Sequence, residues 1–181
     1  MKNILIIIGC GNKLGNSHLL ADSFMKGAIE AGHHVNKINL HQNIQGCLGC
    51  GACQTNGNHC VIQDSMSEIY PLFMQADVVV LASPLYFWSI SSRLKCFIDR
   101  LYAISKEDQY PFKETILLMS AGDDHFYTFH QAVSFYRFYT QALGWEDKGM
   151  VLAGGCEKKE HQPYVKQDDL DKAYLLGRSL G

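Results

Sequence analysis

Four of the seven cysteines lie close together in the sequence: Cys47, Cys50, Cys53 and Cys60. Thiolates are soft ligands, and four of them in one segment favour a bound metal. A structural zinc ion would use the same four thiolates, with His59 or His41 able to replace one of them. The alternative is that the four cysteines are free thiols in a tight turn, which suits a reducing compartment.

A glycine-rich segment from Gly9 to Ser17 follows the apolar run of residues 3–8. That run is mostly β-branched, as in a strand that is buried on both faces of a parallel sheet. Three glycines then break the pattern before an amphipathic segment, which predicts a turn leading into the N-terminus of a helix. Backbone N–H groups and the helix dipole favour an anion at such a place, most often a phosphate.

The spacing of these glycines narrows the kind of phosphate. They read G-x-G-x-x-x-G, one residue longer than the dinucleotide fingerprint, and the second strand ends without the acidic residue that holds a ribose hydroxyl. The Gly-Lys-Ser/Thr sequence of a P-loop is also missing. A single phosphate held by N–H groups and by Asn12, Asn16 and Ser17 fits best, with Asn16 or Ser17 capping the helix. The alternative is a tight turn that holds no ligand.

A third candidate segment contains three consecutive aromatic residues, Tyr86, Phe87 and Trp88, shortly after a buried strand and Pro84. Flat rings beside backbone amides form a good wall for a planar heterocycle, but such rings can equally cover the ends of helices. Gly122, in the loop after the next strand, allows a ligand to approach the backbone closely. A phosphate at one end and a flat ring at the other describe flavin mononucleotide, FMN.

Alternating strand-like and helix-like segments position these loops. We expect strands at about residues 3–8, 35–40, 77–82, 115–120 and 148–152. We expect helices at about residues 16–31, from 64 or 65, at 91–103, at 125–143 and from 167, the second with a capping box formed by Ser65 and Glu68. Such alternation predicts a parallel sheet with helices on both faces, a three-layer α/β/α fold. Ligands of such sheets bind beyond the carboxyl ends of the strands.

Composition excludes several classes of protein. The 181 residues fit one domain, residues 1–181, with a sizeable core. A net charge of -2 with 47% hydrophobic residues gives no sign of nucleic-acid binding or of attraction to an anionic membrane. No apolar run approaches the ~20 residues of a membrane span, and the N-terminal run enters a glycine loop instead of a signal-peptide cleavage site. Together with the odd number of cysteines, this predicts a cytoplasmic protein.

Four motifs make the sequence resemble the NADPH-dependent FMN reductase family of flavodoxin-like proteins. Within that family it is most similar to the iron–sulfur flavoproteins and their cluster-free NAD(P)H oxidoreductase relatives. The motifs are residues 9–17 (GCGNKLGNS), 47–53 (CLGCGAC), 83–89 (SPLYFWS) and 94–100 (LKCFIDR). The resemblance covers nearly the whole chain in order. It implies a flavodoxin-like fold with a five-stranded parallel sheet in the order 2-1-3-4-5.

The resemblance also implies roles for the candidate loops: residues 10–17 hold the FMN phosphate, residues 84–88 line the isoalloxazine ring and residues 121–124 close its other side. The residues expected to bind FMN are Cys10, Asn12, Lys13, Asn16, Ser17, Pro84, Leu85, Tyr86, Phe87, Trp88, Ala121, Gly122 and Asp123. Cys10 and Asn12 stand where the family usually has serine and arginine. Because the phosphate clamp then lacks a charged guanidinium fork, with only Lys13 as a neighbouring cation, we expect FMN to be held loosely.

For the cysteine segment the resemblance adds a third alternative. The spacing of Cys47, Cys50, Cys53 and Cys60 is similar to the compact [4Fe-4S] motif of iron–sulfur flavoproteins, in which the cluster would relay electrons to the flavin. Cluster-free relatives keep a similar cysteine pattern. A cluster, a zinc ion and free thiols therefore all stay open as alternatives.

The implied function is an FMN-dependent NAD(P)H oxidoreductase. Hydride would pass from the nicotinamide to the flavin, and electrons would then pass to a small acceptor such as a quinone, a free flavin or a nitroaromatic compound. The alternative is an electron-transfer flavoprotein that carries FMN and a [4Fe-4S] cluster but does not bind nicotinamide. Neither function requires an acid–base or nucleophile constellation, and we assign no catalytic side chain. Exposed apolar surface around the flavin predicts a homodimer or homotetramer.

Overall fold

The computed structural model describes residues 1–12, 14–40, 44–107, 109–156 and 162–181. Strands alternate with helices along these residues. The strands are β1 (Asn3–Ile8), β2 (His34–Asn39), β3 (Val78–Pro84), β4 (Glu114–Ser120) and β5 (Glu146–Ala153). The helices are α1 (Asn16–Glu30), η1 (Ala52–Gln54), α2 (Met66–Gln75), α3 (Ser92–Arg100), η2 (Leu101–Ile104), α4 (His130–Ala142) and α5 (Gln167–Arg178).

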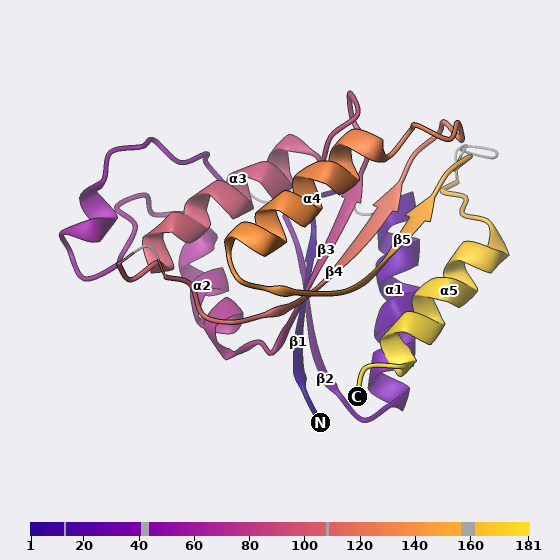
Figure 1. The fold of residues 1–181 in the computed structure, drawn as a ribbon, viewed down its shortest axis with the longest axis horizontal. Helices are drawn as coiled ribbons and strands as arrows, with labels where there is room; N and C mark the ends of the chain where they lie inside the picture. The colour runs from indigo at the N-terminus through magenta and orange to yellow at the C-terminus, as the bar shows by residue number, and fades with distance from the viewer. Residues whose placement is uncertain (13, 41–43, 108, 157–161) are drawn as a thin grey trace.

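The five strands form a parallel sheet in the order β2-β1-β3-β4-β5 (Figure 1). Ile4 of β1 pairs with Val35 of β2 on one side and with Val78 of β3 on the other. Central parallel strands are covered on both faces, and residues 4–8 and 78–84 are accordingly all buried. The predicted flavodoxin-like order 2-1-3-4-5 is confirmed.

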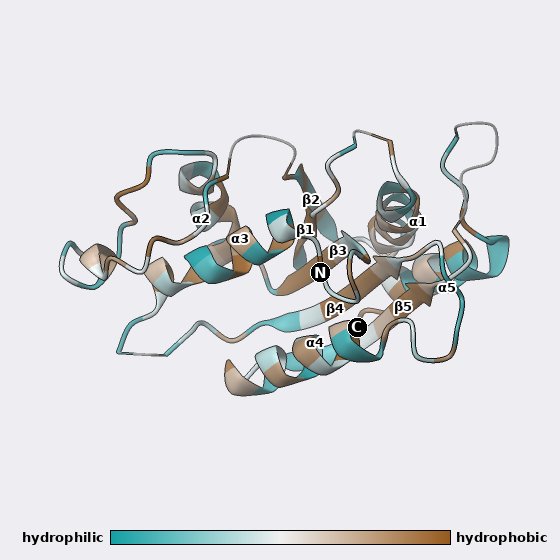
Figure 2. Ribbon diagram, turned by 90° about the horizontal axis from the view of Figure 1, so that it is seen from above, coloured by the Kyte–Doolittle hydropathy of each residue, from teal (hydrophilic) through white to brown (hydrophobic). Residues whose placement is uncertain are grey.

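Successive side chains of β1 point to opposite faces of the sheet and belong to two separate cores. Ile4, Ile6 and Ile8 pack with residues of α1 and α5. Leu5 and Ile7 pack on the other face with residues of α2, α3 and α4. Figure 2 shows these helices on the two sides of the sheet, with hydrophobic residues concentrated along the strands. The three-layer α/β/α prediction is therefore confirmed.

Helices α1 and α5 lie side by side and cross at a pair of glycines (Figure 1). A Cβ atom on Gly27 would lie 2.1 Å from the carbonyl oxygen of Tyr174, and one on Gly177 would lie 2.2 Å from that of Phe24. Only glycine permits so close an approach of two helix backbones. The contact fixes α1, the helix whose N-terminus follows the glycine-rich loop.

The predicted start of the fourth helix is wrong by five residues. Helix α4 begins at His130, whereas the sequence pattern predicted a start near His125. Residues 125–129 form turns instead, in which the Thr128 N–H donates to the His125 carbonyl at 3.0 Å. The hydroxyl of Thr128 donates to the carboxylate of Asp123. A side chain that bonds back to the preceding loop competes with helix formation, which accounts for the late start.

The predicted capping box of the second helix is also wrong. Ser65 is the N-cap of α2, as expected, but its side chain makes no capping hydrogen bond. The carboxylate of Asp64 takes part of that role, because its Oδ1 accepts from the N–H of Met66 at 3.0 Å. The helix starts where the sequence predicts, but a different side chain supports its first turn.

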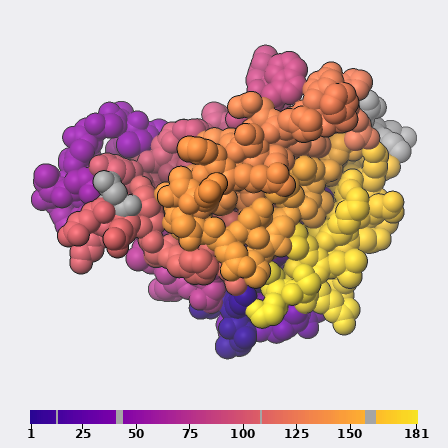
Figure 3. All heavy atoms as spheres, viewed as in Figure 1, coloured from indigo at the N-terminus to yellow at the C-terminus, as the bar shows by residue number. Residues whose placement is uncertain are grey.

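Two segments stand out from the body of the molecule in the space-filling view (Figure 3). One is the long cysteine-containing loop that leads from β2 to α2, and the other is the aromatic loop after β3. Among the described helices, none combines the length and the apolar character needed to cross a lipid bilayer.

Candidate functional site

The loops after β1, β3 and β4 meet at the carboxyl edge of the sheet (Figure 1). β1 and β3 are neighbours, but the helices that follow them pack on opposite faces, α1 on one and α3 on the other. A crevice forms where the chain turns to opposite faces in this way. The candidate site lies in this crevice.

The glycine-rich loop delivers the N-terminus of α1 to the crevice. Gly15 is the N-cap of α1 and has no side chain to accept a hydrogen bond from the first helical turn. The free N–H groups of that turn, together with the helix dipole, make an anion site. A cavity of about 160 Å³ lies beside it, and the loop residues that line it include Cys10, Asn12, Asn16 and Ser17.

The side chains of Asn16 and Ser17 have partners within the protein. The Nδ2 of Asn16 donates to the Cys156 carbonyl at 2.9 Å, and its Oδ1 accepts from the Tyr164 N–H at 2.8 Å. The fully buried hydroxyl of Ser17 lies 2.9 Å from that of Ser120. Neither side chain caps α1, so that prediction is wrong. Because these side chains are engaged, the backbone N–H groups are the main anion donors of this loop.

A cation that the sequence motifs did not indicate lies against the same loop. A Cβ atom on Gly11 would lie 3.4 Å from the Nε of Arg93, a residue of α3. The Nη1 of Arg93 donates to the Leu40 carbonyl at 2.9 Å, which holds the guanidinium in place. Its charge partly compensates for the neutral side chain of Asn12. Lys13, the cation that we expected to act here, lies outside the described residues.

The aromatic loop after β3 forms a two-residue hairpin turn. Tyr86 and Ser89 exchange backbone hydrogen bonds of 3.0 and 3.1 Å. Between them, Phe87 and Trp88 both have positive φ angles, 46° and 59°. Turns with two positive φ angles normally contain Asn-Gly, so two aromatic residues in these positions are strained. Phe87 is 93% exposed and Trp88 is 55% exposed, so the turn holds both rings outside the core.

A second cavity, of about 370 Å³, lies beside this turn and shares three lining residues with the first. Both cavities are lined by Leu85, Ala121 and Gly122. The first ends at the helix N-terminus, and the second ends at the rings of Phe87 and Trp88. An anion end and an aromatic end therefore lie next to each other at the carboxyl edge of the sheet.

Asp123 borders the aromatic end of the crevice. A hydrogen bond from Thr128, helped by the nearby ring of His125 at 3.4 Å, lowers the pKa of its carboxyl group. The side chain therefore stays an ionised acceptor at neutral pH.

The structure brings the predicted FMN-binding residues together. Nine line the cavity at the helix N-terminus: Cys10, Asn12, Asn16, Ser17, Pro84, Leu85, Tyr86, Ala121 and Gly122. Phe87, Trp88 and Asp123 line the aromatic cavity. The predictions missed Ser120 and Pro163, which also line the first cavity. The position of Ser120 at the end of β4 was a usable signal, whereas nothing in the sequence around Pro163 points to the site.

The four clustered cysteines line a third cavity, of about 150 Å³, away from the crevice. All seven cysteines of the chain are free thiols. Gly49 and Gly51 have positive φ angles, which let the loop wind tightly, and the Gly49 N–H lies 3.4 Å from the sulfur of Cys47. The described His, Cys, Asp and Glu side chains nevertheless include no group of three or more already in position to hold a metal ion. His41 lies outside the described residues, and His59 lines a different cavity.

Comparison with known proteins identifies the family. Residues 2–134 match the family of NADPH-dependent FMN reductases. The chain belongs to the NADPH-dependent FMN reductase family. The resemblance on which the predictions rest is thereby confirmed.

One relative of this chain is an iron-sulfur flavoprotein of Archaeoglobus fulgidus. It is 36% identical over 96 residues, which make up 52% of this chain and 43% of the relative. The chain spans about half the length of the curated relatives it matches.

Solved structures share the fold of this family member. An NAD(P)H:quinone oxidoreductase from Methanothermobacter marburgensis has a TM-score of 0.77 at 17% identity, and the match covers 98% of this chain and 94% of the other. An FMN-dependent NADH-azoreductase from Bacillus anthracis, solved with FMN, has a TM-score of 0.70 at 18% identity. The match covers 98% of this chain and 96% of the other.

The crevice fits the flavin named by the family. A helix N-terminus without a side-chain cap suits the phosphate, and the open aromatic end suits a planar ring that substrates must reach. Gly122 has open space where a Cβ would stand, so its backbone is accessible to a ring. The residues present are therefore compatible with FMN.

The cysteine cavity offers thiol groups, which are the donor type that binds the iron of an iron–sulfur cluster. The buried Nε of Arg100, a residue that lines this cavity, has no hydrogen-bond partner among the described residues. An unpaired buried N–H donor favours an acceptor or anionic group beside it. The assignment of Cys47, Cys50, Cys53 and Cys60 as metal ligands stays a prediction.

Proposed function

We propose that the chain is an FMN-dependent NAD(P)H oxidoreductase that passes electrons from a nicotinamide to a small acceptor such as a quinone, a free flavin or a nitroaromatic compound. The observation that carries this proposal is the adjacency of two cavities that share three lining residues, one at the α1 N-terminus and one at the exposed rings of Phe87 and Trp88. Bound FMN would supply the redox chemistry itself.

The residues of the chain would bind FMN and position it for the substrates. Backbone N–H groups at the start of α1 hold the phosphate, and the side chain of Asn12 adds a neutral polar contact. The hairpin at residues 86–89 forms one wall for the ring, and the backbone of residues 121–123 forms another. Because Phe87 and Trp88 lie outside the core, a nicotinamide and then an acceptor can stack on the same open side in turn.

Anaerobic oxidation of NADPH and NADH by FMN-loaded protein, with menadione as acceptor, tests this proposal. We expect turnover that depends on FMN, and we expect Trp88→Ala to lower kcat/KM by up to about tenfold through loss of an aromatic contact. Leu175→Ala, on an exposed position of α5, is the matched control and should leave the rate unchanged. Absence of oxidation of either nicotinamide with any of the three acceptor classes would refute the proposal.

A second candidate is an electron-transfer flavoprotein with a [4Fe-4S] cluster. It is favoured by the cavity that Cys47, Cys50, Cys53 and Cys60 share with Arg100, whose buried Nε has no hydrogen-bond partner in the described part of the chain. The four thiolates would hold a cluster that supplies one-electron transfer. Anaerobic reconstitution should then give about four iron and four sulfide per chain, and Cys53→Ser should lower both. Zinc binding with no sulfide would support a structural metal site instead.

We further propose that the chain forms a homodimer or homotetramer in the cytoplasm and folds as one domain. Large apolar side chains are exposed next to the crevice, among them Phe87 and Phe126 at 93% and 87%. The seven free thiols suit a reducing compartment. Sedimentation as a lone 20.3 kDa species would contradict the assembly, and recovery from a cell fraction other than the cytosol would contradict the location.

A further inference from the structure

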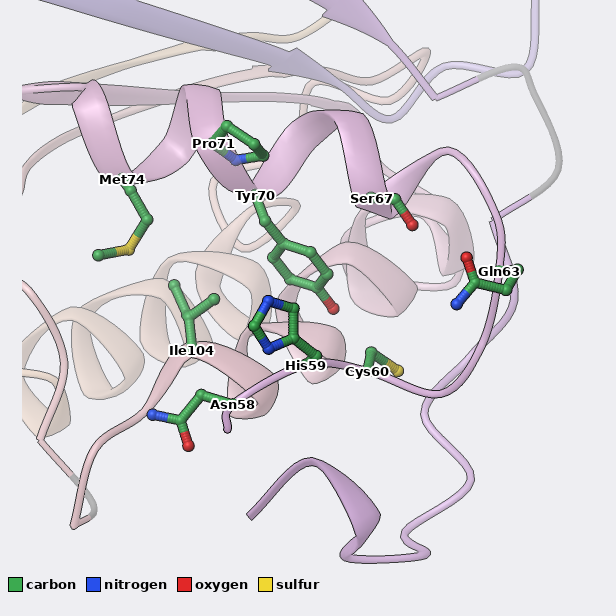
Figure 4. A pocket seen from close by; sticks show the side chains of 9 residues that line it. All are labelled: Asn58, His59, Cys60, Gln63, Ser67, Tyr70, Pro71, Met74 and Ile104. Atoms are coloured by element: carbon green, nitrogen blue, oxygen red, sulfur yellow. The ribbon is translucent and has the colours of Figure 1, made fainter. Parts of the chain in front are cut away.

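A large cavity lies between α2 and the end of the cysteine loop, away from the crevice (Figure 4). Its volume is about 570 Å³, within the range of small-molecule sites. It shares no lining residue with the two cavities of the crevice, but Cys60 lines both it and the cysteine cavity. The proposed function makes no use of it.

The walls of this cavity favour an uncharged, flat molecule. Among the described residues that line it, none carries a carboxylate, an ammonium or a guanidinium group. Tyr70, Met74 and Ile104 supply aromatic and aliphatic surface, and Figure 4 shows the rings of Tyr70 and His59 projecting into the space between α2 and the loop. The hydroxyl of Tyr70 donates to the Arg100 carbonyl at 2.9 Å, which holds its ring in place.

Helix α2 presents an unusual acceptor at this cavity. Pro71 lies inside the helix and has no N–H, so the carbonyl of Ser67 lacks its usual partner four residues later. Ser67 and Pro71 both line the cavity. A carbonyl oxygen released in this way can accept a hydrogen bond from a ligand hydroxyl.

A hydrogen bond within the loop holds the ring of His59 at the wall of this cavity. Its Nδ1 lies 2.7 Å from the carbonyl oxygen of Gly57. A carbonyl only accepts, so Nδ1 is the donor in this hydrogen bond. The cavity thus combines apolar walls with hydrogen-bonding groups, which also include the side chains of Asn58, Gln63 and Ser67.

We propose that this cavity is a binding site for an uncharged aromatic molecule that bears a hydroxyl group, of the phenol and hydroquinone class. The ring packs against Tyr70 and Met74, and the hydroxyl donates to the Ser67 carbonyl. The site is separate from the crevice and does not depend on FMN chemistry.

Calorimetric titration of the FMN-loaded protein with 2-naphthol tests the proposal, with 2-methoxynaphthalene as the probe that lacks the donor and 2-naphthoate as the charged probe. We expect saturable binding of 2-naphthol, about fivefold weaker binding of the methoxy compound because it cannot donate that hydrogen bond, and no measurable binding of the carboxylate. Equal affinity for 2-naphthol and 2-methoxynaphthalene would overturn the assignment of the hydroxyl.

Pro71→Ala is the sharpest variant, because it restores the N–H that occupies the Ser67 carbonyl while keeping the shape of the helix. It should raise the Tm, since proline is unfavourable inside a helix, and weaken 2-naphthol binding by about fivefold without affecting the methoxy probe. Higher Tm with unchanged 2-naphthol affinity would overturn the proposal.

Variants that fill space separate this cavity from the flavin crevice. Met74→Trp should abolish 2-naphthol binding, because it places a large ring where the ligand packs. Gln75→Trp, one residue further on an exposed part of α2, is the matched control and should bind like the unmodified protein. Binding that survives Met74→Trp but is lost in Trp88→Ala would place the probe on the flavin crevice and overturn the proposal.

Discussion

The guanidinium of Arg100 and the carboxylate of Asp64 form a buried, two-point ion pair at the base of the cysteine loop. The distances are 2.8 Å from Nη1 to Oδ2 and 3.1 Å from Nη2 to Oδ1, and the side chains are only 1% and 3% exposed. Arg100 also donates to the carbonyls of Gln45 and Ile62, which lie at the two ends of the loop. The pair therefore joins the start and the end of the segment that carries the four cysteines.

Removal of Arg100 should unfold this loop and destabilise the protein. Arg100→Met leaves Asp64 buried without its partner, and we expect the free energy of unfolding to fall by about 3–5 kcal/mol. Lys95→Met on the same helix is the control, since its ion pair with Asp99 is exposed and contributes little. Chemical denaturation measures both. A loss below about 1 kcal/mol in Arg100→Met would contradict a structural role for the pair.

The same pair predicts how stability depends on pH. Burial alone would raise the pKa of Asp64, but hydrogen bonds from Arg100 and from the backbone N–H groups of Gln45 and Met66 outweigh it and lower the pKa. A lowered pKa in the folded state gives stability that is present above the unfolded value of about 3.9 and is lost as the pH falls through the folded value. Unfolding free energies measured below about pH 4 should therefore fall less steeply in Asp64→Asn than in the unmodified protein. Parallel curves would argue against an ionised Asp64.

The central part of the fold could be predicted from sequence because its signals are local and strong. Residues 78–82 are a continuous apolar run, which only a strand covered on both faces accommodates. The start of α4 could not be predicted from local propensity, because the turn before it depends on a hydrogen bond from Thr128 to Asp123. The residue types in this turn are compatible with a helix, so they did not indicate that hydrogen bond.

The candidate site also has parts that could be predicted from sequence and parts that could not. The two motif loops could be predicted because short segments set their own geometry. Pro163 comes to the crevice from a distant part of the chain, and Arg93 reaches the glycine-rich loop from the start of α3, so packing alone reveals both. The cavity at Tyr70 has no motif, and its key acceptor depends on a proline that in sequence indicates only a weak helix.

FMN should be lost during extensive dialysis, because Asn12 is neutral and the guanidinium of Arg93, which already donates to the Leu40 carbonyl, compensates for it only in part. Asn12→Arg should tighten FMN binding by about tenfold or more, the effect of one hydrogen bond from a charged group. Asn12→Gln, which adds length without charge, should bind like the unmodified protein. Fluorescence titration with FMN measures all three. Retention of a full complement of FMN after dialysis of the unmodified protein would refute the prediction.

Relief of the strained turn at Phe87 and Trp88 should separate stability from function. Asn at position 87 and Gly at position 88 suit positive φ angles, so the double substitution Phe87→Asn with Trp88→Gly should stabilise the fold by about 1–3 kcal/mol. The same change removes both rings from the crevice and should weaken FMN binding and slow NADPH oxidation. Thermal denaturation and FMN titration report the two effects separately. If the double variant loses both stability and FMN binding, the two rings stabilise the fold itself.

The glycine crossing of α1 and α5 predicts a non-additive pair of substitutions. Gly27→Ala and Gly177→Ala each place a methyl group about 2 Å from a carbonyl oxygen of the opposite helix, so each should cost about 3 kcal/mol by forcing the helices apart. Leu175→Ala, at an exposed position of α5, should change stability by less than about 0.5 kcal/mol. Because either substitution separates the same two backbones, the space opened by one partly accommodates the other, and the double variant should lose less stability than the sum of the single losses. Denaturant unfolding of the unmodified protein, the two single glycine variants and the double variant measures this coupling. Fully additive losses would mean that the two glycines act at independent contacts.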